Sequence, residues 1–371
     1  MKLRAKLVHV CILPLLAGCQ TGTNPEAGGG ILWQVAGRGI GAPAVSDSTV
    51  YVASLDHHVL ALDARTGQER WNVTTGVTLG ENEGRNVLIV GNLVIVPDAA
   101  IHAFDRVTGE RRWTFSTTSG DLPGRYILST DGVRVFAGSP AGFAYALDAT
   151  TGQPVWIDSI ARDNISVVIS PVVNRGLVVL SVRHDTNPST GGIVALDAAT
   201  GVVRWRVDFP STGPGRGSGS LRRASFWGEL VVASSDDGTV YAMDRETGAY
   251  RWTSPRPADI TAFDDVRPLA VVGSTVVVGS DRAVITGLDT ATGSERWRIS
   301  GESSVNYEIG SDGTRAYVVN ANLRILAIDV QAGKLLWVGG GRPVGDYTPF
   351  PVSDGVRVYA SGLQAYYALR Y

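Results

Sequence analysis

Hydrophobic and polar residues alternate in short runs rich in Val, Ile, Leu, Ala and Tyr along most of the chain after residue 30. A period of two residues is typical of β-strands that bury one face. Asp-Gly or Gly-Asn between alternating runs predicts a hairpin, because tight turns need residues that tolerate positive φ. The sequence contains eight such turns, at Asp47, Gly91-Asn92, Asp131-Gly132, Asn174, Gly228, Gly273-Ser274, Asp312-Gly313 and Asp354-Gly355.

A second pattern follows seven of these turns: a small residue, an apolar residue and Asp, then Gly four residues later and Trp eight residues later. The Asp residues are Asp63, Asp105, Asp148, Asp197, Asp244, Asp289 and Asp329, and the Trp residues are Trp71, Trp113, Trp156, Trp205, Trp252, Trp297 and Trp337. The Asp-to-Asp spacings are 42, 43, 49, 47, 45 and 40 residues. These spacings match the length of a four-stranded propeller blade.

The two ends of the chain carry complementary halves of an eighth unit. Arg370 stands at the Asp position after the last turn, with no Trp strand behind it, whereas Trp33 lies in a strand that no Asp motif precedes. The sequence therefore predicts an all-β, eight-bladed propeller of four-stranded antiparallel blades, closed by an N-terminal strand that completes the last blade. Eight motif Trp residues and Trp227 then account for all nine Trp of the chain.

The repeated residues have structural roles. The Asp carboxylate can accept backbone N–H groups of the following turn, and the Gly supplies a left-handed backbone conformation. Each Trp is expected to bury about 150–250 Å² between neighbouring blades. The motif residues therefore predict architecture, and seven similarly placed Asp residues are not seven active sites.

The N-terminus has the organisation of a secretion signal. Lys2, Arg4 and Lys6 precede an apolar run that is too short to span a bilayer, and the run ends in small residues before Cys19. This order resembles a bacterial lipoprotein signal, which implies cleavage before Cys19 and lipidation (palmitate among the acyl chains) of that residue. We therefore expect a signal peptide at 1–18, a lipidated Cys and flexible tether at 19–30, and a single propeller at 31–371.

Composition limits the function classes. The formal charge is −2, and removal of the three cations in residues 1–18 makes it −5, which gives no support to nucleic-acid binding. Cys11 leaves with the signal, so that the mature chain keeps only Cys19 and cannot form a disulfide. Gln20, which is not Asp, favours the outer membrane in a two-membrane bacterium.

The repeat resembles the PQQ-type propeller family, over nearly everything after residue 30. That family includes quinone-dependent alcohol and sugar dehydrogenases and the non-enzymatic BamB lipoproteins of the outer-membrane β-barrel assembly machinery. The chain is more similar to the BamB lipoproteins in its signal, in its ring with almost nothing appended, and in its closure by an N-terminal Trp strand. The resemblance implies a binding scaffold that docks on a BamA-like protein, as a monomeric propeller within a complex.

The dehydrogenases of this family hold their quinone against a disulfide of adjacent Cys residues and bind Ca²⁺, and the mature chain has no second Cys. No Gly-rich phosphate-binding loop, Gly-x-Ser-x-Gly elbow or His-x-x-x-His metal motif is present in the sequence. His57-His58 is expected in an exposed turn, and a Ca²⁺ site at Asp236-Asp237 lacks sufficient oxygen ligands. We therefore expect no catalytic residues, no cofactor and no metal.

Partner binding is expected where long connections interrupt the repeat, at 184–192, 210–223 and 254–267. In the BamB lipoproteins the partner surface uses a Leu/Arg loop and an Asp-Val-Asp segment from the last two connections. Leu221-Arg222 resembles the first, and Asp265 matches the second, although Arg267 replaces its other Asp. The candidate partner-binding residues are Arg216, Leu221, Arg222, Arg223, Asp264 and Asp265.

Two other functions stay open. One is a PQQ- or Ca²⁺-dependent oxidoreductase. The other is a surface propeller that binds cell-wall or polysaccharide ligands, which a host with a single membrane would favour.

Overall fold

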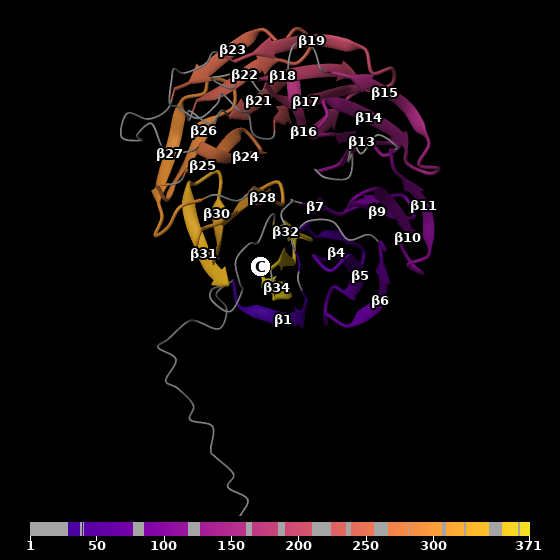
Figure 1. The fold of residues 1–371 in the computed structure, drawn as a ribbon. Helices are drawn as coiled ribbons and strands as arrows, with labels where there is room; N and C mark the ends of the chain where they lie inside the picture. The colour runs from indigo at the N-terminus through magenta and orange to yellow at the C-terminus, as the bar shows by residue number, and fades with distance from the viewer. Residues whose placement is uncertain are drawn as a thin grey trace, which may run out of the picture.

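The fold is an eight-bladed ring in which every assigned element is a β-strand (Figure 1). The computed structural model describes residues 29–37, 39, 41–76, 85–117, 127–160, 165–184, 190–209, 224–234, 239–255, 266–280, 282–305, 309–322, 324–340, 351–362 and 364–371. Within these residues, no helix has the length and apolarity that crossing a membrane requires. The predicted fold class is confirmed.

Each blade is a four-stranded antiparallel sheet whose strands follow one another from the centre of the ring to its perimeter. Blade 1 contains β3 (Ala44–Ser46), β4 (Thr49–Ala53), β5 (His58–Asp63) and β6 (Glu69–Thr74). Blade 2 contains β8 (Leu88–Val90), β9 (Leu93–Pro97), β10 (Ile101–Asp105) and β11 (Arg111–Phe115). Blade 3 contains β12 (Ser129–Thr130), β13 (Arg134–Gly138), β14 (Phe143–Asp148) and β15 (Pro154–Ser159). Blade 4 contains β16 (Ile165–Asn174), β17 (Leu177–His184), β18 (Thr190–Asp197) and β19 (Val203–Asp208).

The second half of the ring repeats this plan. Blade 5 contains β20 (Ser225–Trp227), β21 (Leu230–Ser234), β22 (Val240–Asp244) and β23 (Tyr250–Ser254). Blade 6 contains β24 (Val266–Val272), β25 (Thr275–Ser280), β26 (Val284–Asp289) and β27 (Glu295–Ser300). Blade 7 contains β28 (Ile309–Ser311), β29 (Arg315–Val319), β30 (Arg324–Asp329) and β31 (Lys334–Gly340). Blade 8 contains β32 (Val352–Ser353), β33 (Arg357–Ser361), β34 (Ala365–Arg370) and β1 (Ile31–Ala36). A short parallel pair, β2 (Gly41–Ala42) with β7 (Arg85–Asn86), lies outside the blades.

The ring closes as the sequence predicts. Strand β1 pairs antiparallel with β34, and Trp33 lies opposite Ala368. The closure begins two residues before the strand, because the N–H of Gly29 donates to the carbonyl of Arg370 and the N–H of Arg370 donates to the carbonyl of Gly30. The first and last described segments of the chain therefore complete one blade.

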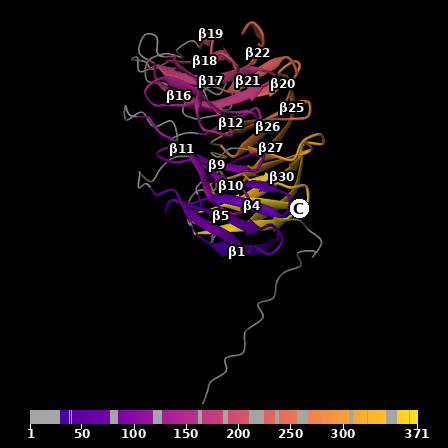
Figure 2. The same cartoon turned by 90° about the vertical axis from the view of Figure 1, so that its right-hand side faces the viewer.

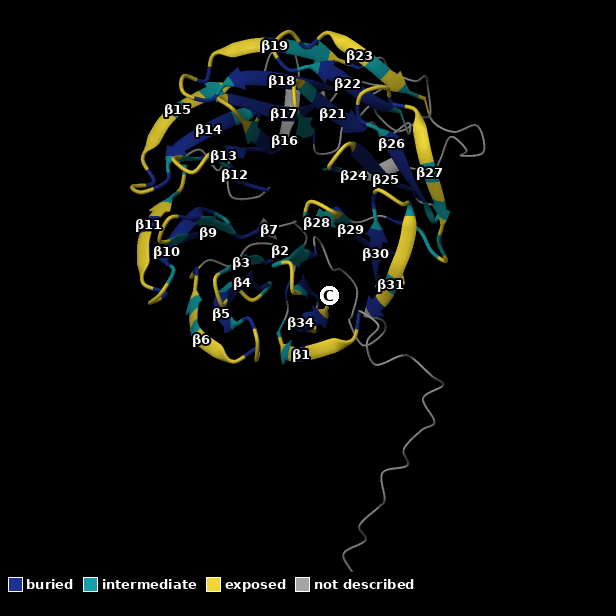
Figure 3. Cartoon of the chain, turned by 180° about the vertical axis from the view of Figure 1, so that it is seen from behind, coloured by how far each residue is buried: buried dark blue, intermediate teal, exposed yellow. Residues whose placement is uncertain are grey.

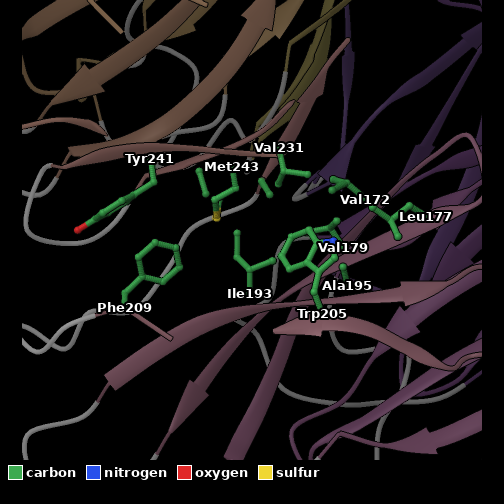
Figure 4. Packing of buried hydrophobic residues seen from close by; sticks show 12 residues of the cluster. Val172, Leu177, Val179, Ile193, Ala195, Trp205, Phe209, Val231, Tyr241 and Met243 are labelled. Atoms are coloured by element: carbon green, nitrogen blue, oxygen red, sulfur yellow. The ribbon is translucent and has the colours of Figure 1, made fainter. Parts of the chain in front are cut away.

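The hydrophobic core lies between the blades. At the contact of blades 4 and 5, Trp205 and Ile193 face Val231 and Met243, and Phe209 packs on Tyr241 with ring centroids 4.5 Å apart (Figure 4). Similar clusters occupy the other blade contacts. Exposure concentrates on the outermost strands, which form the perimeter of the ring (Figure 3).

The two faces of the ring follow from strand direction. In an antiparallel four-stranded blade, the turns between strands one and two and between strands three and four lie on the same face. We call this the motif face, because it carries the eight predicted tight turns and the Asp-to-Gly turns. The turns between strands two and three, and the connections to the next blade, lie on the opposite face, which we call the variable face. Figure 2 shows the ring from the side.

Candidate functional site

The motif Asp residues are used within their own turns. In blade 1, Oδ1 of Asp63 accepts the backbone N–H groups of Arg65 and Thr66 at 3.0 and 2.9 Å, and Oδ2 accepts the guanidinium of Arg70 at 2.8 Å. The same arrangement, including an Arg seven residues after the Asp, recurs in blades 2, 4, 5 and 6. In these blades the carboxylate binds its own turn and its own outer strand.

The Arg partners keep these carboxylates ionised. The hydrogen bond from Arg204 lowers the pKa of Asp197 to about 2, and the hydrogen bond from Arg251 lowers the pKa of Asp244 to about 2. Arg70 and the turn N–H groups likewise hold the pKa of Asp63 well below its ordinary value. A carboxyl that stays ionised and hydrogen-bonded cannot deliver a proton near neutral pH, so these residues are poor candidates for general acids.

The Trp and Gly residues connect each blade to the next. The indole N–H of Trp71 donates to the carbonyl of Arg106, directly after the motif Asp of blade 2, at 3.1 Å. The motif glycine of blade 2, Gly109, has φ +74, and a Cβ there would lie 2.9 Å from the ring of Trp71. The same Gly–Trp approach occurs at every blade contact, and at the closure Gly29 takes the glycine's place against Trp337. These Gly and Trp residues therefore make contacts between neighbouring blades.

The six candidate partner-binding residues, Arg216, Leu221, Arg222, Arg223, Asp264 and Asp265, all lie outside the described residues. So does Cys19. The described flanks, Phe209 and Ala224 for one connection and Pro255 and Val266 for the other, lie at strand ends on the variable face of blades 4 to 6. The partner-binding roles of these six residues remain predictions.

A cavity of about 320 Å³ lies between blades 5 and 6, and its lining includes Pro255 at the variable face and Gly293 and Ser294 in the motif-face turn of blade 6. Val240, Val278 and Leu288 are apolar residues of its lining, and Thr286 also lines it. Thr286 occupies the strand position that holds Tyr145 in blade 3 and Tyr241 in blade 5, and the smaller side chain leaves space. Glu295 and Arg298, which form an ion pair at 2.7 Å, are also part of the lining.

A second cavity, of about 520 Å³, is lined by residues at or beside the innermost strands of blades 2 to 7. Its polar lining is uncharged and consists of amides and hydroxyls: Asn86, Ser129, Thr130, Asn174, Ser225 and Ser311. The side-chain amide of Asn86 is already hydrogen-bonded. It donates to the carbonyl of Leu128 at 3.0 Å and accepts from the N–H of Leu128 at 2.8 Å. Among the residues that the structure describes, none of those lining this cavity is charged.

His57 and His102 lie where blades 1 and 2 meet. His57, at φ +64, lies with Nδ1 3.0 Å from Oδ2 of Asp98, and its side chain is only 15% exposed. Thr75 donates to the same carboxylate oxygen at 2.5 Å. The prediction that His57-His58 lies in an exposed turn is wrong for His57, because a contact with Asp98 of blade 2 covers its side chain. The contact of Asp98 with His57 was not predicted. Asp98 lies outside the repeated Asp-Gly-Trp motif, at a position that holds Ser in most blades.

His102 lies in the same region and is almost fully buried. Burial, followed by the charge of Arg111, lowers its pKa to about 4, so the ring is neutral at physiological pH. Its Nδ1 lies 3.1 Å from Oγ1 of Thr114. In the part of the chain that the structure describes, no three His, Cys, Asp or Glu side chains are grouped closely enough to hold a metal.

Comparison with known proteins gives a consistent family. The model of the family described as "Outer membrane protein assembly factor BamB" matches residues 23–254 and 189–369. The outer membrane protein assembly factor BamB of Yersinia pestis is 26% identical over 64% of this chain, and the match spans 61% of that protein. The quinohemoprotein alcohol dehydrogenase of Comamonas testosteroni is 31% identical, but over only 29% of this chain and 17% of that enzyme. The crystal structure of BamB from Moraxella catarrhalis superposes with a TM-score of 0.58 at 24% identity, covering 79% of this chain and 82% of that one.

Proposed function

The chain belongs to the PQQ-repeat family of the outer membrane protein assembly factor BamB, and from this membership we propose that it is a membrane-anchored, non-enzymatic scaffold assisting the assembly of outer-membrane β-barrel proteins. In this proposal residues 1–18 are a signal peptide, Cys19 carries the lipid, and the propeller faces the periplasm from the outer membrane. A BamA-like barrel assembly protein is the proposed partner.

The main support for a scaffold role is that the repeated motif residues form structural contacts. Asp, Gly and Trp of the motif are engaged in turns and blade contacts. The connections of different length at blade 5 provide variation on a rigid ring, and such loops commonly present binding residues. Arg222 and Asp265 are therefore our proposed contacts with the partner.

Charge reversal tests these contacts. We expect Arg222→Glu combined with Asp265→Arg to reduce co-purification with the BamA-like protein by about tenfold or more, because like charges then meet across the interface. The matched control reverses Arg175 and Glu229, an exposed ion pair on the motif face, and should leave recovery unchanged. If the unaltered chain, the Arg222/Asp265 variant and the control are recovered equally, the two connections do not bind the partner.

Quinone binding tests the enzymatic alternative, which the match to quinohemoprotein alcohol dehydrogenase keeps relevant. PQQ and Ca²⁺ are added to the purified protein, and absorption and thermal unfolding are measured. The proposed scaffold gives no spectral change and no shift of the melting temperature. A saturable change in either signal would contradict the non-enzymatic proposal.

A further inference from the structure

The outermost strands of the ring differ in the residue before the Trp. Five blades carry Arg there, at Arg70, Arg112, Arg204, Arg251 and Arg296, and each pairs with the motif Asp of its own blade. The other three carry Val155, Leu336 and Leu32. The side chains of these three residues are 43–47% exposed, so apolar groups replace ion pairs on the surface there.

Two of the three apolar strands are neighbours. Strand β31 of blade 7 exposes Leu335, Leu336 and Val338, and β1 of blade 8 exposes Ile31 and Leu32 (Figure 3). Neither strand contains an acidic residue. We call these five residues the apolar rim.

The apolar rim is bordered by two exposed cations and by the carboxylate of Asp329, which lies opposite Lys334 in the β30–β31 register. Lys334, the single Lys after the signal sequence, begins β31, and Arg370 occupies the blade 8 position that is Asp in every other blade. Both are exposed. An apolar surface with two exposed cations at its edge, in a protein whose mature charge would be −5, has features of an interfacial membrane contact.

The N-terminal segment enters the ring at this rim. Gly29 lies against the ring of Trp337 in β31, and its N–H is bonded to Arg370 at the end of β34. Residue 29 leads directly into β1, so the segment from Cys19 joins the propeller at the motif-face end of the apolar rim. The ten residues from Cys19 to Gly29 span at most about 35 Å when fully extended. A lipid on Cys19 would therefore keep this rim near the bilayer.

We propose that the apolar rim rests on the bilayer surface, with its Leu, Ile and Val side chains at the boundary of headgroups and acyl chains and with Lys334 and Arg370 near lipid phosphates. This inference rests on the lipidation of Cys19 proposed above. In this orientation the variable face and blades 3 to 5, on the far side of the ring from the rim, are left open to a partner (Figure 1).

The experiment uses the lipidated protein in vesicles of phosphatidylethanolamine and phosphatidylglycerol that contain acyl-chain spin-labelled lipid. A polarity-sensitive fluorophore is placed at Leu336→Cys, and a matched probe at Val155→Cys in the equivalent exposed position of blade 3. The sequence has no Cys other than Cys11 and Cys19, so labelling is specific once Cys19 is acylated. We expect blue-shifted, lipid-quenched emission at 336 and aqueous emission at 155.

A second pair of variants separates the apolar contact from the anchor. Leu336→Arg with Val338→Thr introduces residue types that other blades carry at these positions, and Asp329 is available to pair with the new Arg, so folding should be preserved. A fluorophore at Leu32→Cys should then lose its lipid quenching to the level of the 155 probe. The control, Val155→Arg with Ile157→Thr next to Asp148, should leave quenching at 32 unchanged.

The outcomes distinguish this inference from the anchor on which it rests. Floating of the protein with the vesicles without quenching at 336 would overturn the rim contact and leave the lipid anchor intact. Absence of an acylated Cys19 in the mass spectrum would overturn both. Photocrosslinking from position 336 to a protein, and not to lipid, in native membranes would assign the rim to a protein partner and would also overturn the proposal.

Discussion

Blades 6 and 8 form the same turn, one with a continuous chain and the other from two separate segments. In blade 6 the N–H of Gly293 donates to the carbonyl of Asp289 at 2.8 Å, and the N–H of Asp289 donates to the carbonyl of Ser294 at 2.8 Å. In blade 8 the pairs are Gly29 with Arg370 at 2.8 Å and Arg370 with Gly30 at 2.7 Å. The backbone pattern is therefore retained without chain continuity.

The side chains of the two turns differ more than the backbone does. Asp289 accepts two turn N–H groups and the guanidinium of Arg296, whereas Arg370 offers no acceptor. Both turns nevertheless bring a glycine against a Trp of the preceding blade. The comparison teaches that backbone pairing and the Gly–Trp contact define the turn, and that the Asp carboxylate adds stability to it.

Removing the Trp of each outer strand should have the largest effect. We expect Trp33→Ala and Trp297→Ala each to cost about 3–5 kcal/mol, because each leaves a cavity between blades. Only Trp33→Ala should also free its strand, since β1 has no covalent turn to β34. Hydrogen exchange of residues 31–36 should become much faster in Trp33→Ala, while that of β27 should stay slow in Trp297→Ala. Equal protection of both strands would show that chain continuity is unimportant.

The turn glycines should give the next largest effect. Gly293 has φ +72, and an added Cβ would lie 2.4 Å from the ring of Trp252. Gly29 has φ +89, and an added Cβ would lie 2.8 Å from Trp337. We expect Gly293→Ala to cost more than Gly29→Ala, because the separate segment can shift.

The control for these two variants is Gly313→Ala, at φ +91 with open space around the position. It should show only the conformational cost, about 1–2 kcal/mol. Urea denaturation measures all three variants. The packing explanation fails if Gly313→Ala is as destabilising as Gly293→Ala.

Acid should weaken the blades that carry an Asp–Arg pair. The pKa of Asp244 is lowered to about 2 in the folded protein, against an ordinary value near 4. Its contribution is therefore present above pH ~4 and is lost as the pH falls towards ~2. Asp244→Asn and Arg251→Gln should each flatten the loss of stability across this range in denaturation curves measured at several pH values. Blade 8 has no such carboxyl, so Arg370→Gln should leave the acid profile as it is in the unaltered chain.

Exchanging the turn residues should give the smallest effect and the clearest contrast. Arg370→Asp should change the free energy of unfolding by less than about 0.5 kcal/mol, because the backbone bonds of this turn do not involve the side chain. Asp289→Arg should cost about 1–2 kcal/mol, since two N–H groups lose their acceptor and Arg296 meets a like charge. Thermal unfolding of both variants tests the comparison, and a large loss in Arg370→Asp would contradict it.

Much of the fold could be predicted because the repeat is local. The Asp, Gly and Trp positions, the turn glycines and the Arg370–Trp33 mismatch identified eight blades and their closure, since each signal lies within one blade. The contacts around Asp98 could not be predicted in this way. Asp98 meets His57 from 41 residues away, and no local pattern marks a contact between two blades.

In the candidate site too, local features could be predicted from the sequence and contacts between blades could not. The sequence identified the variable connections at blade 5 by their length, but the cavity between blades 5 and 6 depends on Thr286 standing where blades 3 and 5 hold Tyr145 and Tyr241. The apolar rim was also missed. Its residues lie at the two ends of the sequence, at Ile31-Leu32 and at Leu335-Leu336, and closure of the ring makes them neighbours.

The sequence by itself determined the strand period, the number of blades and the segment that completes the ring, because these depend on turns and residue spacing within one repeat. The tertiary structure alone decided which side chains meet between blades and which apolar residues remain on the perimeter. The physical reason is that closing the ring sets the distance between residues hundreds of positions apart, and burial, charge pairing and cavity volume all depend on that distance.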